Sequence, residues 1–130
     1  MANATRNLDP APTAVAGPTI EVDVDTQRAA RAFLAQVTRR YDVERAILFG
    51  SRARRDHRPE SDADIAVILR GHRQRFLDTK LELADIAFDV LLETGILIQP
   101  LPVWADEWAH PEQYRNPALL ESIGRDGVRL

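Results

Sequence analysis

The spacing of apolar residues changes along the chain, and each change predicts a new structural element. From Asp25 or Thr26, either of which suits a helix N-cap, to Arg40, apolar side chains recur at helical spacing and predict an amphipathic helix. Two short apolar runs follow at residues 45–49 and 64–69, and their composition is typical of buried strands. The polar residues between these runs predict a turn-rich connection, with a short helix starting near Ser51.

The second half of the chain predicts a long helix, an edge strand and a shorter helix. Residues 73–93 have an apolar face wide enough to contact both the sheet and a further surface, such as another chain. Residues 96–101 predict a third strand, which Pro100 and Pro102 confine to an edge. The segment with Trp104 and Trp108 predicts a loop or short helix whose aromatic rings pack on the body. A last helix at 117–125 is followed, from Gly127, by a free tail.

Length and composition indicate one soluble domain. Residues 1–24 contain three prolines and no periodicity, and they predict a flexible arm ahead of a single domain at 25–130. No apolar run approaches the ~20 residues of a membrane span, and no signal pattern opens the chain. The absence of cysteine excludes thiolate chemistry and fits a cytoplasmic location. A net charge of −3 argues against general nucleic-acid binding.

The first strand ends at Gly50-Ser51, a pair suited to phosphate. Glycine lacks a Cβ, so a bulky anion can approach its backbone closely. Ser51 offers a hydroxyl and an N–H to phosphate oxygens.

Asp62 and Asp64 stand two residues apart at the start of the second strand, so their carboxylates are expected on the same face. Two adjacent carboxylates repel each other unless a cation lies between them. Mg²⁺ prefers one or two carboxylates and completes its shell with substrate phosphates. The pair is therefore predicted to be a metal site.

These residues together resemble a known signature. The string GSRARRDHRPESDADIAV, residues 50–67, is similar to the motif of the minimal nucleotidyltransferase family, within the DNA polymerase β-like nucleotidyltransferase superfamily. The resemblance implies an α/β (α+β) fold with a small mixed β-sheet and flanking helices, like the polymerase β palm. It also implies that Asp62 and Asp64 are the catalytic residues, with Mg²⁺ bridging them and the triphosphate of ATP. Gly50 and Ser51 would hold the β- and γ-phosphates.

The resemblance also implies roles for residues around the motif. Arg54 or Arg55 is expected to steady the leaving pyrophosphate, since a guanidinium presents a fork of donors to phosphate. The alternative is that most arginines of this loop are solvent-facing charges. Family members commonly add a third carboxylate from the next strand. Leu97 and Gln99 occupy the matching face here, and neither is acidic.

Three functions remain open at this point. The first is transfer of AMP from ATP to a protein hydroxyl, as the antitoxin of a HEPN-type ribonuclease toxin, which the resemblance implies. The second is a binding module that has lost turnover and neutralises its partner by occlusion, which the missing third acid favours. The third, transfer to a small molecule such as an antibiotic, has little support because the chain has no second domain to grip it. A homo- or hetero-oligomer is compatible with each.

Overall fold

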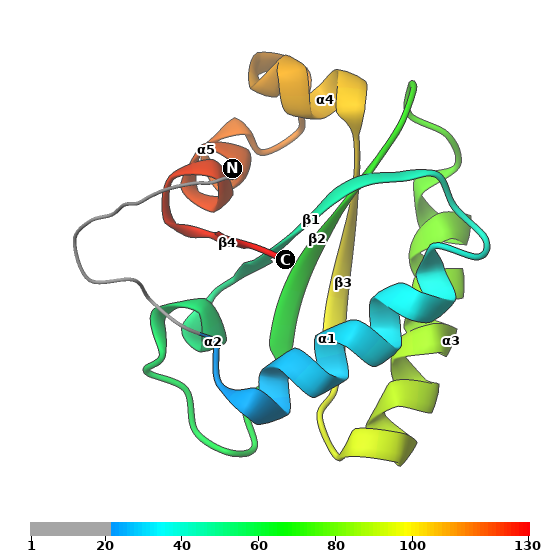
Figure 1. Cartoon of the computed structure of the whole chain (residues 1–130). Coiled ribbons are helices and arrows are strands. Elements are labelled where there is room, and N and C mark those ends of the chain that lie inside the picture. The colour runs from blue at the N-terminus through cyan, green and yellow to red at the C-terminus, as the bar shows by residue number, and fades with distance from the viewer. Residues whose placement is uncertain (1–21) are drawn as a thin grey trace, which may run out of the picture.

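A four-stranded mixed sheet forms the centre of the computed structural model, which describes residues 22–130 (Figure 1). Its strand order is β3-β2-β1-β4. The strands are β1 (Val43–Phe49), β2 (Ala63–Leu69), β3 (Ile98–Trp104) and β4 (Val128–Arg129). β1 pairs antiparallel with β2 and with β4, whereas β2 and β3 run parallel. The predicted small mixed sheet is therefore confirmed, and β3 is an edge strand as its prolines require.

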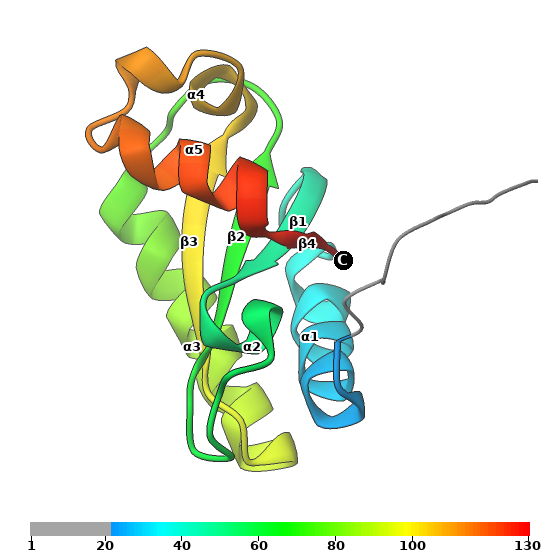
Figure 2. The same ribbon diagram turned by 90° about the vertical axis from the view of Figure 1, so that its left-hand side faces the viewer.

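Helices cover both faces of this sheet. They are α1 (Val24–Val37), the short α2 (Ser51–Arg54), α3 (Phe76–Thr94), α4 (Ala105–Ala109), a 3₁₀ turn η1 (Pro111–Gln113) and α5 (Pro117–Asp126). α1 and α3 pack together on one face, and α5 lies across the other, as the two orthogonal views show (Figures 1 and 2). Within residues 22–130, no helix is both long and apolar enough to cross a bilayer.

The alternation of side chains along β2 divides the core in two. Ile65 and Val67 belong to the larger cluster, which α1 and α3 cover. Ala66 and Ile68 point to the other side and join a smaller cluster with Leu120 of α5. Trp104 is buried in the first cluster, while Tyr114 and the half-buried Trp108 pack on the second, so the aromatic rings pack on the body as predicted. Trp104 itself is the last residue of β3 and not part of a loop or helix, because the strand runs three residues further than predicted.

The first helix begins and ends earlier than its sequence pattern predicts. Its N-cap is Asp23, whose carboxylate accepts hydrogen bonds from Thr26 N at 3.1 Å and Thr26 Oγ1 at 2.6 Å. Neither Asp25 nor Thr26 is the cap, and the helix ends at Val37 rather than Arg40. The predicted arm lies outside the described residues, except for its last three.

The C-terminal residues form a strand instead of a free tail. β4 pairs with Ile47 and Leu48 of β1 and so becomes the second edge of the sheet. Gly127 makes this possible, because a Cβ there would overlap Ile47 Cγ2. The predicted tail was wrong because a two-residue strand carries no periodicity, and its pairing depends on a neighbour distant in sequence.

Candidate active site

The predicted site residues meet at one end of the sheet. β1 ends where β2 and β3 begin, so Phe49 is the register partner of Asp64, and Asp64 is in turn the partner of Gln99 on β3. Gly50 and Ser51 follow Phe49 directly. Asp64 and Gln99 alternate with core residues, so both face the same side of the sheet as α5. Antiparallel and parallel pairing together thus bring three distant segments to one place.

Gly50 is the point of closest approach. Its backbone has φ 77° and ψ −157°, a region used essentially only by glycine. A Cβ at this position would overlap Asp64 Oδ2, so the missing side chain leaves room for the carboxylate of Asp64. The Gly50 carbonyl accepts hydrogen bonds from Ala53 N and Arg54 N, both at 3.1 Å, which turn the chain into α2. The anion that approaches this glycine in the structure is therefore the protein's own carboxylate.

Asp62 and Asp64 lie close enough to influence each other's charge. Burial raises the pKa of the Asp64 carboxyl, the Asp62 carboxylate raises it further, and the Arg54 guanidinium partly opposes both. Asp62, just ahead of β2, accepts a hydrogen bond on Oδ2 from Gln99 Nε2 at 3.0 Å. The pair is half-buried and carries two negative charges, which is a setting that attracts a cation.

Gln99 takes the place where a third carboxylate is expected. It is the register partner of Asp64 and bonds to Asp62, so it faces the pair directly. Leu97 precedes β3, and its carbonyl accepts from Ala63 N at 2.9 Å. Among residues 22–130, no group of three or more acidic, histidine or cysteine side chains is arranged to hold a metal ion. A cation at this site would thus have two carboxylates from the described part of the chain.

The two predicted phosphate-binding arginines differ in position. Arg54 is near enough to Asp64 to lower its pKa, and its Nε also pairs with Asp56 at 3.1 Å on the surface. Arg55 is exposed, has φ 64°, and its side chain makes no ion pair or hydrogen bond with another described residue. Ser51 Oγ likewise has no hydrogen-bond partner in the described part of the chain and is half-buried. The structure brings Arg54 and Ser51 to the carboxylates, but it gives Arg55 no such contact.

Arg52 is a site residue that the sequence reasoning missed. Its side chain is only 2% exposed and lies beneath the loop that leads to Asp62. Nε donates to Ser61 O at 3.0 Å, while Nη2 donates to Ser61 O at 2.9 Å and Pro59 O at 3.0 Å. Because Ser61 immediately precedes Asp62, Arg52 fixes the loop where the first carboxylate emerges. These loop partners are main-chain carbonyls, which leave no signal in a sequence.

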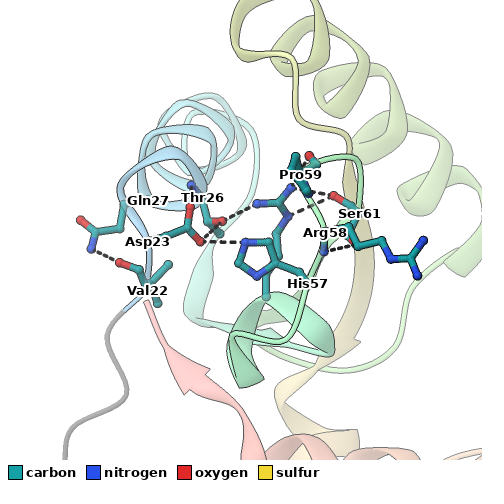
Figure 3. A network of polar contacts seen from close by, with 9 residues as sticks. Val22, Asp23, Thr26, Gln27, His57, Arg58, Pro59 and Ser61 are labelled. Atoms are coloured by element: carbon teal, nitrogen blue, oxygen red, sulfur yellow. Dashed lines mark hydrogen bonds and ion pairs between the residues drawn. The ribbon is translucent and has the colours of Figure 1, made fainter.

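The same arginine joins this loop to α1. Figure 3 shows Asp23 and Thr26 at the start of α1, with Pro59 and Ser61 of the loop nearby. Arg52 Nη1 donates to Thr26 Oγ1 at 2.8 Å, and Thr26 Oγ1 donates to Asp23 Oδ1. His57 Nε2 lies 3.4 Å from Asp23 Oδ1. Partial burial would raise the pKa of Asp23, but the bonds from Thr26 and the charges of His57 and Arg52 lower it overall. The start of α1, α2 and the loop are thus one polar network.

A hollow of about 390 Å³ adjoins this network. Its lining residues are Asp23, Asp25, Arg52, His57, Pro59, Thr94, Gly95 and Ile96. Asp62 and Asp64 are not among them, so the carboxylate pair does not line this hollow.

Comparison with known proteins gives two matches. The model of the family described as "Polymerase beta, Nucleotidyltransferase" matches residues 33–99, just over half of the chain, and this stretch contains the whole site. A solved structure from Sulfolobus solfataricus, described as a "putative nucleotidyltransferase", superposes with a TM-score of 0.51. The two chains are 19% identical, and the match covers 81% of each, so it supports the fold. A search of curated proteins finds no match.

Proposed function

The chain belongs to the polymerase beta nucleotidyltransferase family, and from this premise we propose that it transfers AMP from ATP to a hydroxyl group of a partner protein. The observation that carries the proposal is the meeting of Asp62, Asp64 and Gly50 where β1 ends and β2 begins. The described residues form one small domain around a single sheet, which offers little surface to enclose a small acceptor. This favours a protein as the acceptor and a larger contact area around the site.

The carboxylate pair fits a hard divalent cation such as Mg²⁺. The raised pKa of Asp64 reflects burial and an unbalanced neighbouring charge, and a cation between the carboxylates relieves both. Bound there, Mg²⁺ would supply charge neutralisation for the triphosphate and the developing negative charge. Asp62 and Asp64 would be its ligands, and Gln99 would orient Asp62 through the hydrogen bond that it already donates.

The other residues position the nucleotide. Ser51 Oγ, which lacks a partner among the described residues, is proposed to donate to the β- or γ-phosphate, next to the Gly50 backbone. Arg54 is proposed to hold the pyrophosphate as it leaves, and Arg55 contributes only if the loop moves it closer. The acceptor oxygen attacks the α-phosphorus, its bond to phosphorus forms, and the bond to pyrophosphate breaks. Among residues 22–130, no third carboxylate joins the pair to receive the proton of the acceptor hydroxyl.

This last point predicts slow or partner-dependent transfer. Gln99 cannot act as a base, so the partner surface is proposed to supply one. Gln99→Glu would place a third acid beside Asp62 and Asp64, and we expect it to increase Mg²⁺-dependent transfer. The matched control is Gln113→Glu, which adds the same charge on the distant turn η1 and should leave the rate unchanged. Equal rates in wild type and Gln99→Glu would show that a third acid is not what limits transfer.

The partner we propose is a HEPN-type ribonuclease toxin, with this chain as its cytoplasmic antitoxin. Resemblance to the minimal nucleotidyltransferase family supports this role. Modification of a hydroxyl on the toxin would silence it without a lasting complex, whereas tight binding alone would require one.

A second candidate function is favoured by Gln99. The amide at the position of the third acid is compatible with a domain that binds its partner and no longer turns over. In that case the site would keep its shape and its nucleotide, and the partner would be silenced by occlusion.

The deciding experiment co-expresses the partner with the wild type or with the Asp62→Asn/Asp64→Asn variant and then weighs the partner by intact mass spectrometry. A gain of one adenylyl group with the wild type alone supports transfer. If the partner is silenced equally by both proteins without a mass gain, occlusion replaces the enzymatic proposal. In parallel, ATP should raise the melting temperature of the wild type only with Mg²⁺ present, and the double variant should lose this shift.

A further inference from the structure

The outer face of α3 exposes a continuous apolar stripe. Large apolar side chains that are more than half exposed occur here at four positions, Leu77 (64%), Leu81 (56%), Phe88 (55%) and Leu92 (71%). Their spacing of four, seven and four residues places them on one line along the helix. The residues that α3 buries against the sheet and α1 lie on its opposite side: Thr79, Leu83, Ile86, Ala87 and Val90. α3 therefore has two apolar faces, and only one is covered by the described chain.

A row of carboxylates borders one edge of this stripe. At 100° per residue, the acidic side chains of α3 all project beside the stripe on the same side: Asp78, Glu82, Asp85, Asp89 and Glu93. Two of them already have partners, since Asp78 pairs with Arg75 at 2.8 Å and Glu82 accepts from Tyr41. Asp85 and Asp89 form no ion pair with another described residue. Lys80 is the one cation within the helix and lies on the other edge.

We infer that this face of α3 docks an amphipathic helix of a partner protein, with leucine-like side chains along its seam and lysine or arginine along one edge. An apolar stripe at helical spacing matches a helix laid along it, because such a helix presents anchors at the same intervals. The partner helix needs basic side chains along one edge because the row of five carboxylates on α3 attracts cations and repels acidic surfaces.

Charge also argues against two other occupants. A second copy of this chain would bring an identical acidic edge, so an antiparallel pair of α3 helices would place carboxylates against carboxylates. An anionic membrane surface would repel the same row of charges. An amphipathic helix with a basic edge matches both the apolar stripe and the acidic row beside it.

The docking face and the carboxylate site lie on opposite sides of the sheet. α3 packs with α1 over the larger cluster, on the face of the sheet away from α5 (Figure 2). Asp64 and Gln99 face the side of α5. The inference therefore holds whether or not the site transfers AMP, and a docked helix would leave the site open.

The test uses the full chain and a fluorescent synthetic peptide of the length of α3, with leucines at helical spacing and lysines along one edge. A second peptide carries glutamate in place of each lysine. Two double variants probe the surface, Leu81→Ser/Phe88→Ser for the stripe and Asp85→Lys/Asp89→Lys for its edge. Val24→Ser is the matched control, because Val24 is 69% exposed and lies on α1. All changed side chains are exposed, and circular dichroism verifies that each variant is folded.

We expect the lysine peptide to bind the wild type, with an affinity that falls as salt is added. The stripe variant should weaken this binding roughly tenfold or more, as loss of two anchors does at interfaces. The edge variant should weaken it and remove the salt dependence, while Val24→Ser should bind as the wild type does.

Three outcomes would overturn the inference. One is absence of binding by the lysine peptide, and another is equal binding by the glutamate peptide. The third is a wild-type dimer in sedimentation that Leu81→Ser/Phe88→Ser dissociates, which would make a second copy the occupant.

Discussion

At the scale of single residues, Asp64 carries a charge that the fold disfavours. Burial first, and then the Asp62 carboxylate, raise its pKa above the ordinary value of 3.8. Below pH 3.8 the carboxyl is protonated in both the folded and the unfolded chain, so folding carries no penalty. As the pH rises through the raised folded pKa, the unfolded chain ionises more readily than the folded one, and stability falls.

The isosteric change Asp64→Asn removes this penalty. We expect the variant, without metal, to be more stable than the wild type at about pH 7, and the gain to vanish below the unfolded pKa. Urea denaturation across the pH range measures the difference. Added Mg²⁺ should stabilise the wild type and leave Asp64→Asn unchanged. A variant less stable than the wild type at neutral pH would mean that Asp64 makes favourable contacts in the folded chain.

Replacing Gly50 and Gly95 by alanine separates the effect of backbone strain from that of steric overlap. Gly50 and Gly95 both have positive φ, 77° and 81°, but only Gly50 has an atom in the place of a Cβ. Gly95→Ala should cost about 1 kcal/mol of stability from strain alone. Gly50→Ala should lower stability by roughly 2–3 kcal/mol, because strain is joined by the overlap of the new Cβ with Asp64 Oδ2. It should also abolish the rise in melting temperature with Mg²⁺ and ATP, because the Asp64 carboxylate must move. If both variants lose the same stability and Gly50→Ala keeps the rise in melting temperature with Mg²⁺ and ATP, then Gly50 serves only to form the turn.

At the scale of elements, the sequence predicts those features that depend on a pattern within one segment. It does not predict those that depend on contacts between distant segments. β1, β2 and α3 were predictable because their apolar runs and spacing reflect burial along the element itself. Gly95 ends α3 in the left-handed conformation, with its N–H on Leu91 O at 2.8 Å, as a glycine there predicts. The cap at Asp23 was missed because three acceptors, Asp23, Asp25 and Thr26, compete within four residues. Asp23 is the cap because the N–H and hydroxyl of Thr26 donate to its carboxylate. Thr26 is held in this position because it is fully buried and bonded to Arg52.

The candidate site shows the same division. The position of Asp62 and Asp64 at the start of a strand follows from local sequence, and so does the turn at Gly50. That Gln99 faces them depends on the parallel register of β3, which no local pattern records. The burial of Arg52 depends on carbonyls of a loop and on a helix 26 residues earlier in the chain.

Arg52 holds three elements together, and its replacement tests that role. Arg52→Lys keeps the charge but loses the guanidinium fork that donates to Ser61, Pro59 and Thr26. We expect a loss of about 1–3 kcal/mol of stability, because buried acceptors lose their donors. Affinity for Mg²⁺ and ATP, measured well below the melting temperature, should also fall, since Asp62 follows Ser61. Arg39→Lys changes an exposed side chain in the turn just after α1, and it should change neither the stability nor the affinity. Reduced stability with wild-type affinity would limit Arg52 to a structural role.

At the scale of the whole molecule, the sheet separates two surfaces with different chemistry. The side of α5 has the carboxylate pair, and the other side has the apolar face of α3 with its acidic edge. Between them lies the larger cluster, whose members Leu48, Ile65 and Val67 are fully buried. A close-packed core deforms little, so we expect a change at one surface to reach the other only if a whole element shifts.

Binding at the two surfaces is therefore expected to be independent. Asp62→Asn/Asp64→Asn should lose the thermal shift with Mg²⁺ and ATP and keep the wild-type affinity for the lysine peptide. Leu81→Ser/Phe88→Ser should show the reverse, because its side chains are exposed and distant from Gly50. The quadruple variant should combine both losses additively, as changes without shared contacts do. Calorimetric titration of the peptide, with and without Mg²⁺ and ATP, measures any coupling directly. A peptide affinity that changes with nucleotide in the wild type, and no longer changes in Asp62→Asn/Asp64→Asn, would mean that α3 reports the state of the site through the sheet.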